Sequence, residues 1–289
     1  MTNSANITNL NPDPTAQSGK YPSLLRLSWM RVLLEIKLFF RVKDALIFIF
    51  AYPIFMLAIF ASIFGANGAT VGPDPGIPYA QYFLPGMVAT GVMLSSFQNL
   101  AMSIPIERDE GGLKRLRGMP MPPSVYFFGK TGQVLALTVL QMVLLLSVAA
   151  LLFDVNLPNT TGKWVTLIWV ILLGTATGSV LGVAFSSVPK SSKSAAAIVT
   201  PIVLILQFTS GVFFVFSELP NWMQNLAAIF PLKWMAQGVR SAILPEWGQA
   251  MELTGNWELP KVALVLGLWL VIGLIVGPRT FAWLKRGDK

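Results

Sequence analysis

The stretch ALIFIFAYPIFMLAIFASIF, residues 45–64, carries no charged side chain along its whole length. A helix needs about 20 mostly apolar residues to cross the hydrocarbon core of a bilayer. A helix of similar length on the surface of a soluble domain would show a polar face every turn. The stretch therefore predicts a transmembrane helix, and it decides the class of the whole chain.

The composition points the same way, since 54% of the residues are hydrophobic and only 12% are charged. Soluble domains carry about 25% charged residues, roughly twice this share. The chain has no cysteine and no histidine, which excludes disulfides, thiolate or imidazole metal sites and histidine-based acid–base catalysis. No catalytic residue, metal ligand or bound cofactor is therefore predicted for this chain.

Five further apolar runs are long enough, or nearly so, to cross a bilayer: residues 83–106, 131–153, 164–185, 195–216 and 262–278. We therefore expect an all-α membrane protein with six transmembrane helices in one domain over residues 21–289. The polar residues 1–20, with two prolines, predict a disordered cytoplasmic tail. Gly174, Gly178 and Gly182 recur on one face of the fourth run, which suits close helix contact, although a merely tolerated face is the alternative.

The positions of the 21 Lys and Arg residues predict the orientation. On a six-span layout, nearly all of them lie on the side that holds both termini. The exceptions are Lys163, Lys233, Arg240 and Lys261. Because basic residues gather in the loops on the inner side of a membrane, both termini are expected in the cytoplasm of a bacterial cell, at its inner membrane. The net charge of +8 thus reflects membrane topology and does not predict a nucleic-acid partner.

Residues 25–43, directly before the first span, have the pattern of an amphipathic helix. Apolar side chains recur every three or four residues at Trp29, Val32, Leu33, Ile36 and Phe40, while other faces carry Arg31, Glu35, Lys37 and Arg41. The pattern predicts a helix in the membrane interface, with basic groups toward lipid phosphates. A soluble helix packed on a partner is the alternative.

Residues 107–130 connect the second and third spans on the cytoplasmic side. Acidic residues come first, then a glycine pair, a basic turn with two leucines three residues apart, and prolines that end any helix. A short helix of this kind suits docking in the groove of a partner, mainly through Leu113 and Leu116, better than a solvated loop does. The predicted docking residues are Glu107, Arg108, Asp109, Glu110, Gly111, Leu113, Arg115, Leu116 and Arg117.

Residues 217–260, between the fifth and sixth spans, contain two amphipathic stretches that are too short to cross a bilayer. Pro220, Pro231 and Pro245 delimit them. They predict either re-entrant helices buried against the bundle or helices that lie on the membrane surface, and the residues alone do not decide between the two.

None of the six predicted spans has Asp, Glu, Lys or Arg in its middle. Ion-coupled transporters place ionisable groups at this depth, so a secondary transporter is disfavoured. If the chain moves a substrate, the energy is expected to come from a partner bound at residues 107–123.

Two motifs resemble the membrane subunits of ABC-2 type transporters, close to the daunorubicin-resistance and nodulation-factor exporter branch. One motif comprises Glu107-Arg108, Gly111-Gly112-Leu113, Leu116-Arg117 and Pro120. The other comprises Ser210-Gly211-Val212-Phe213-Phe214, Leu219-Pro220, Trp222, Pro231-Leu232 and Arg240. The resemblance covers nearly everything after residue 20.

The resemblance implies an interfacial helix before the first span, a cytoplasmic coupling helix at residues 107–120 and two re-entrant helices before the last span. It also implies a second permease copy, which would form a homodimer with this chain, and separate ATP-binding cassette subunits that bind ATP and Mg. The chain is then expected to be the permease of an exporter of an amphipathic drug, lipid or glycan. The alternative is a non-transporting assembly or immunity factor whose cytoplasmic loop recruits a soluble partner.

Overall fold

The computed structural model describes residues 23–65, 68 and 70–283, so the tail expected at residues 1–20 lies outside the described part of the chain. Six of the described helices are long and apolar enough to cross a membrane, which confirms the all-α class with six spans. They are α2 (Lys43–Gly65), α3 to α4 (Tyr79–Asp109), α6 (Pro123–Phe153), α7 (Thr161–Phe185), α8 (Ser192–Thr209) and α11 (Leu259–Thr280). The described strands are two short ones, β1 (Thr70–Val71) and β2 (Ile77–Pro78), which pair antiparallel.

Two helix ends differ from the predicted spans. The third spanning helix begins at Pro123, well before the predicted residue 131, because proline at the first helical position needs no hydrogen-bonded N–H. The fifth ends at Thr209, before the predicted residue 216, because Gly211 takes a positive φ of 67° and turns the chain.

The second span is the centre of the bundle and is interrupted once. It consists of α3 (Tyr79–Met93), a π-helical turn η1 (Leu94–Gln98) and α4 (Asn99–Asp109), and 78% of its apolar window is buried inside the protein. Such π-helical turns are rare and widen the helix by one residue per turn. The remaining spans surround this central rod and expose apolar side chains outward, as a bilayer requires.

The glycine face of α7 makes close contact with neighbouring helices. A Cβ atom at Gly182 would lie 2.8 Å from the carbonyl oxygen of Phe97, and one at Gly174 would lie 2.6 Å from the sulfur of Met235. Gly178 lies against Ser96 in the same way. Of the two readings of this face, close helix contact is the one that the structure bears out.

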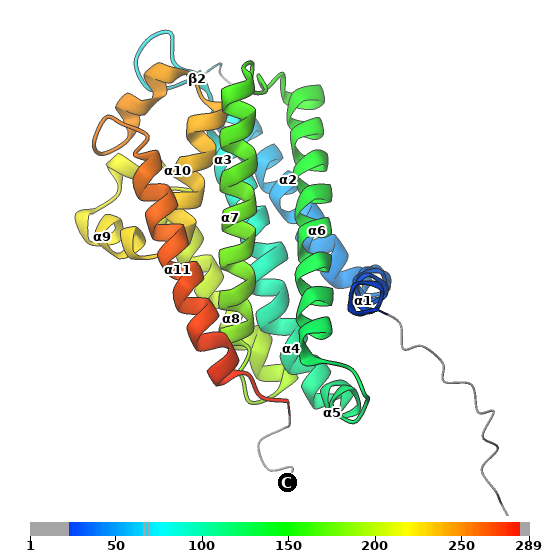
Figure 1. Cartoon of the computed structure of the whole chain (residues 1–289). Helices are drawn as coiled ribbons and strands as arrows, with labels where there is room; N and C mark the ends of the chain where they lie inside the picture. Colours follow the sequence, from blue (N-terminus) through cyan, green and yellow to red (C-terminus); the bar gives the residue numbers. More distant parts are fainter. Residues whose placement is uncertain (1–22, 66–67, 69, 284–289) are drawn as a thin grey trace, which may run out of the picture.

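Two short helices precede the last span. Every residue of α10 (Pro231–Ile243) is buried, whereas α9 (Asn221–Ile229) buries only Ala227. Figure 1 shows α10 inside the bundle beside α3, α7 and α11, with α9 projecting at its edge. The two predicted short helices therefore exist, and one is internal while the other lies on the outside.

The first helix, α1 (Leu24–Phe39), lies across the outside of the bundle and is seen end-on in Figure 1, next to α6. The short helix α5 (Gly112–Arg117) lies at the same end of the bundle, as does the end of α11. The opposite end carries the strand pair and the 3-10 helix η3 (Glu246–Met251). A further 3-10 turn, η2 (Phe216–Glu218), connects α8 to α9.

Candidate coupling site

The predicted cytoplasmic helix forms as α5, a reversal between two long helices. Gly111 takes a φ of 76°, in the left-handed region that glycine tolerates, and this allows the chain to turn back from α4 into α5. Pro122 and Pro123 then start α6. In Figure 1, α5 protrudes beyond the ends of the spans. The site is thus a short, conformationally fixed helix at one end of the bundle.

The two leucines of α5 face inward. Leu113 is 0% exposed and Leu116 is 9% exposed, and both pack in an apolar cluster with Leu100, Ile104 and Tyr126. The prediction that these leucines form the apolar contact to a partner is therefore wrong for this structure. They anchor α5 to the bundle, because a helix of only six residues has no stability of its own.

The outward face of α5 is basic. Arg115 and Arg117 are exposed, and Met119 just after the helix is 48% exposed. Glu110, before the turn, is exposed as well. Of the nine residues predicted for docking, these charged side chains are the ones that a partner can reach.

The remaining charged residues of the motif are engaged inside the chain. An Nη2 group of Arg108 donates to the carbonyl oxygens of Ser186 and Pro189, at 3.2 and 2.9 Å. Asp109 accepts from the backbone N–H of Ser192 at 2.6 Å. These bonds fix the end of α4 to the turn between α7 and α8. Arg108 and Asp109 therefore hold in place the residues that lead into α5.

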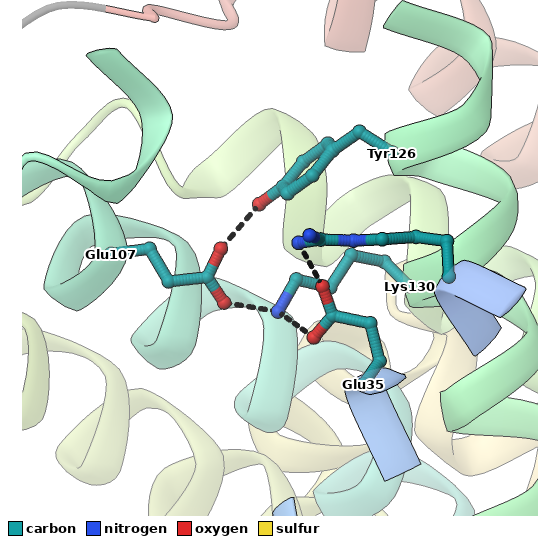
Figure 2. A network of polar contacts seen from close by, with 5 residues as sticks. Glu35, Glu107, Tyr126 and Lys130 are labelled. Atoms are coloured by element: carbon teal, nitrogen blue, oxygen red, sulfur yellow. Dashed lines mark hydrogen bonds and ion pairs between the residues drawn. The ribbon is translucent and has the colours of Figure 1, made fainter. Parts of the chain in front are cut away.

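Glu107 belongs to a buried ion network that three helices share (Figure 2). Nζ of Lys130, on α6, lies 2.8 Å from Oε2 of Glu35, on α1, and also pairs with Glu107, on α4. The hydroxyl of Tyr126 donates to Glu107 at 3.1 Å. Arg31 pairs with the other carboxylate oxygen of Glu35, Oε1. Two cations thus face two carboxylates, and the cluster is electrically balanced.

Burial makes this balance necessary. Lys130 is 2% exposed and Glu35 is 3% exposed. A charge taken out of water costs several kcal/mol unless an opposite charge and hydrogen bonds compensate it. Arg31 and Lys130 also lie near the Tyr126 ring, at 5.5 and 5.8 Å from its centroid, where a cation is attracted to the π face.

The network changes the interpretation of α1. Arg31 and Glu35 were expected on the polar faces of an interfacial helix whose basic groups face lipid phosphates, but they point inward against α6. Close contact is possible because α6 has Gly129 and Gly132 there: a Cβ atom at Gly132 would lie 3.0 Å from a methyl carbon of Val32. The exposed side of α1 is mostly apolar and includes Trp29, 63% exposed, although Arg26 and Lys37 are exposed there as well, and Arg41 is exposed in the turn that follows.

An aromatic cluster completes the site and was not predicted. Phe281 and Trp283, just after α11, have ring centroids 5.0 Å apart, and the Trp283 ring lies 5.8 Å from that of Tyr126. A cavity of about 550 Å³ opens between this segment and α5 and is lined by Leu116, Arg117, Met121, Pro123, Ala282 and Trp283. The segment after the last span therefore contributes to the site.

Sequence reasoning missed three members of this site. Lys130 was counted as a loop charge that follows the positive-inside pattern, and no role at this site was predicted for Tyr126 or Trp283. The glycine pair at 129 and 132, three residues apart on one helix face, was the available signal that another helix approaches α6 at this point.

The residues predicted for the re-entrant segment fall into two groups. Gly211 and Arg240 come together, since Nη1 of Arg240 donates to the Gly211 carbonyl oxygen at 3.2 Å. Nε of Arg240 also pairs with Glu252 at 2.5 Å, and both side chains are buried. Pro220 precedes α9 and Pro231 begins α10, so they set helix ends, while Trp222 is 61% exposed on α9.

Comparison with known proteins places the coupling motif and most of the bundle in a family. The family model described as ABC-2 type transporter matches residues 26–244. The chain is 24% identical over 193 residues to the inner membrane transport permease YadH of Escherichia coli K12, which covers 66% of this chain and 74% of that protein. The permease of the same name from Shigella flexneri is similar to the same extent.

Proposed function

The chain belongs to the ABC-2 type transporter family, and from this we propose that it is the permease subunit of an ATP-driven exporter in the bacterial inner membrane. The family is one of membrane transport subunits that work with ATP-binding partners. The cargo that we propose is an amphipathic drug, lipid or glycan-type molecule, moved out of the cytoplasm. ATP and Mg would bind on the partner subunit, and a second permease copy would complete the translocation unit as a homodimer.

The observation that carries this proposal is the construction of α5. Its basic face, with Arg115 and Arg117, points outward, while Leu113 and Leu116 hold the helix to the bundle. Arg108 and Asp109 fix the end of α4, and Glu107 connects it through Lys130 to α1. A rigid helix that protrudes from the spans can transmit a push from a soluble partner, because its movement requires the spans to move with it.

The distribution of charge in the spans supports an external source of energy. The charged residues of the second and third spans lie at the ends near α5: Glu107, Arg108 and Asp109 end α4, and Lys130 is in the first turns of α6. These residues are paired with one another or with backbone groups. Gradient-driven carriers place ionisable groups at mid-membrane depth, where they bind the coupling ion.

The basic residues at the α5 end of the bundle also support the proposed topology. α5, α1 and the end of α11 lie toward the same end of the bundle in Figure 1, and most of the described basic residues predicted to be cytoplasmic belong to these helices or flank them, while Lys190 and Lys193 lie at the turn between α7 and α8. With both termini in the cytoplasm, α5 would face the compartment that contains ATP.

Reconstitution with a candidate ATP-binding subunit, sought among the genes beside the one that encodes this chain, tests the proposal. The permease alone is expected to hydrolyse no ATP. Together with its partner in inside-out vesicles, it is expected to accumulate cargo only when ATP and Mg are supplied, and this accumulation is expected to survive dissipation of the proton gradient.

Two results would contradict the proposal. Transport by the permease alone, driven by a proton gradient, would show that the energy does not come from a partner. Stable binding of a soluble partner with no ATP-dependent movement of any amphipathic probe would instead favour an assembly or immunity factor.

A further inference from the structure

An apolar groove of about 400 Å³ lies on the side of the bundle between α7, α8 and α11, away from the ion network at α1. Side chains from four helices and from the junction of α9 and α10 form its wall, among them Phe97, Ala184, Leu206, Met235, Trp269 and Val276. The volume lies within the range of about 300–1,000 Å³ that is typical of small-ligand sites.

The few polar groups of the wall are satisfied within the chain. The hydroxyls of Ser187 and Thr280 both donate to the carbonyl oxygen of Ala184, at 3.0 and 3.2 Å respectively. The indole N–H of Trp269 donates to the carbonyl oxygen of Ile229 at 2.7 Å, and its ring stacks on Phe230. The groove therefore offers its occupant an apolar surface and almost no hydrogen-bonding group.

The length of the groove matches one leaflet of a bilayer. Trp269 lines one end and Thr280 the other, and a helix rises about 1.5 Å per residue, so the lining run of α11 covers about 16 Å. Half of the roughly 30 Å hydrocarbon core is about the same length. A single acyl chain that lies along α11 would fill it from the membrane midplane to the interface.

Basic side chains surround the mouth at the α5 end of the bundle. Lys190 and Lys193 are exposed in and just after the turn between α7 and α8, whose Ser187 and Val188 line the groove. Arg279 is exposed on α11, two helical turns after Ile272 and on the same face. The acidic residue at this turn, Asp109, accepts from the backbone of Ser192. The charge at the mouth is thus predominantly positive.

The geometry points to a binding site for one anionic glycerophospholipid of the surrounding leaflet, with an acyl chain in the groove and its phosphate near Lys190, Lys193 and Arg279. Each Lys or Arg near a membrane surface adds to the attraction for anionic lipid. This inference does not rest on the proposed export activity, since the lipid is a bound component of the bilayer and its binding requires neither ATP nor a partner.

Quenching of tryptophan fluorescence tests the site directly. The purified full chain in non-ionic detergent is titrated with dibrominated phosphatidylglycerol or with dibrominated phosphatidylcholine. Saturable quenching is expected with the anionic lipid at concentrations about tenfold lower than with the zwitterionic lipid. The substitution Trp269→Phe is expected to remove most of the saturable component.

Two variants separate the groove from its mouth. Val276→Phe, which fills the groove, and Lys190→Glu combined with Arg279→Glu are each expected to weaken binding of the anionic lipid about tenfold or more. The matched controls are Leu274→Phe, on the lipid-facing side of the same helix, and Lys37→Glu combined with Lys43→Glu, and these are expected to bind as the wild type does. Retention volume in size exclusion shows that each variant is folded.

Three outcomes would overturn the inference. Equal quenching by both lipids would remove the role of charge, and unchanged binding in Val276→Phe would place the lipid elsewhere. A shift of Val276→Phe from dimer to monomer, with lipid binding unchanged, would identify the groove as a contact between two copies of the chain.

Discussion

Lys130 on α6 lies 2.8 Å from Glu35 on α1, and both side chains are almost completely buried. The helix that runs along the outside of the bundle is therefore connected by an ion pair to a transmembrane helix. Because Lys130 also pairs with Glu107, the same ammonium group connects α1 to the helix that leads into α5. Movement of α5 and movement of α1 are thus coupled through one side chain.

Removal of the shared cation is expected to destabilise the protein strongly. Lys130→Met leaves Glu35 and Glu107 without their common partner, and the loss of one member of a buried ion pair costs about 3–5 kcal/mol. Thermal unfolding in detergent measures the effect, with Lys37→Met on the exposed side of α1 as the control. The double variant Lys130→Met with Glu107→Gln is expected to recover part of the loss, since Glu35 keeps Arg31. A single variant as stable as the wild type would contradict the assignment.

The two sides of α5 are expected to respond differently to substitution. Arg115→Glu combined with Arg117→Glu should leave thermal stability unchanged but lower partner binding and transport about tenfold or more, which corresponds to ~1.4 kcal/mol. Leu116→Ala should instead lower stability by about 2–5 kcal/mol, because it opens a cavity in the cluster beneath α5. Arg26→Glu combined with Lys37→Glu is the matched charge control. Wild-type partner binding by the α5 arginine variant would disprove the docking face.

The contact between α1 and α6 predicts a contrast between two glycines. Gly132→Ala places a methyl group against Val32 and is expected to displace α1 and reduce thermal stability. Gly267→Ala on α11 meets no atom within 4 Å and is expected to be neutral or to stabilise the helix by up to about 1 kcal/mol. Equal melting temperatures of the two variants would show that α1 does not require this close approach.

The absence of cysteine makes the proposed topology directly measurable, since each introduced cysteine is the only thiol in the chain. Arg115→Cys, on the exposed face of α5, is expected to react with a membrane-impermeant maleimide in inside-out vesicles and not in intact spheroplasts. Asn256→Cys, exposed before α11, should show the reverse pattern. Labelling of both positions from the same side would require an even number of crossings between them and would contradict the three spans α6, α7 and α8.

The sequence was sufficient for the spans because a bilayer imposes a simple rule on length and polarity. The stretch at residues 45–64 corresponds closely to α2, and the bounds of the last span extend by only a turn. The fifth span was predicted too long because residues 210–216 are apolar enough to continue a helix, and only the positive φ of Gly211 ends it.

The site was less accessible from sequence, since its geometry depends on which face of a helix meets a neighbour. Leu113 and Leu116 had the spacing of an apolar docking face, and the same spacing serves equally well to anchor α5 to its own chain. Arg31 and Glu35 had the spacing of a surface ion pair, and their burial depends on Gly129 and Lys130, far away in the sequence. The spacing of residues shows which side chains share one face of a helix, but only the tertiary contacts show what that face packs against.

The π-helical turn at η1 determines how the second span responds to the loss of one residue. One residue more per turn is what a single-residue insertion in an ordinary α-helix produces, and each residue of such a helix advances the phase by about 100°. Deletion of one residue between Leu94 and Gln98 would therefore restore a regular helix and leave Glu107 facing Lys130, whereas the same deletion in the regular part of α4 would rotate Glu107 by about 100° and break that pair. The apolar middle of the span can thus lose this residue without changing the contacts at its charged end.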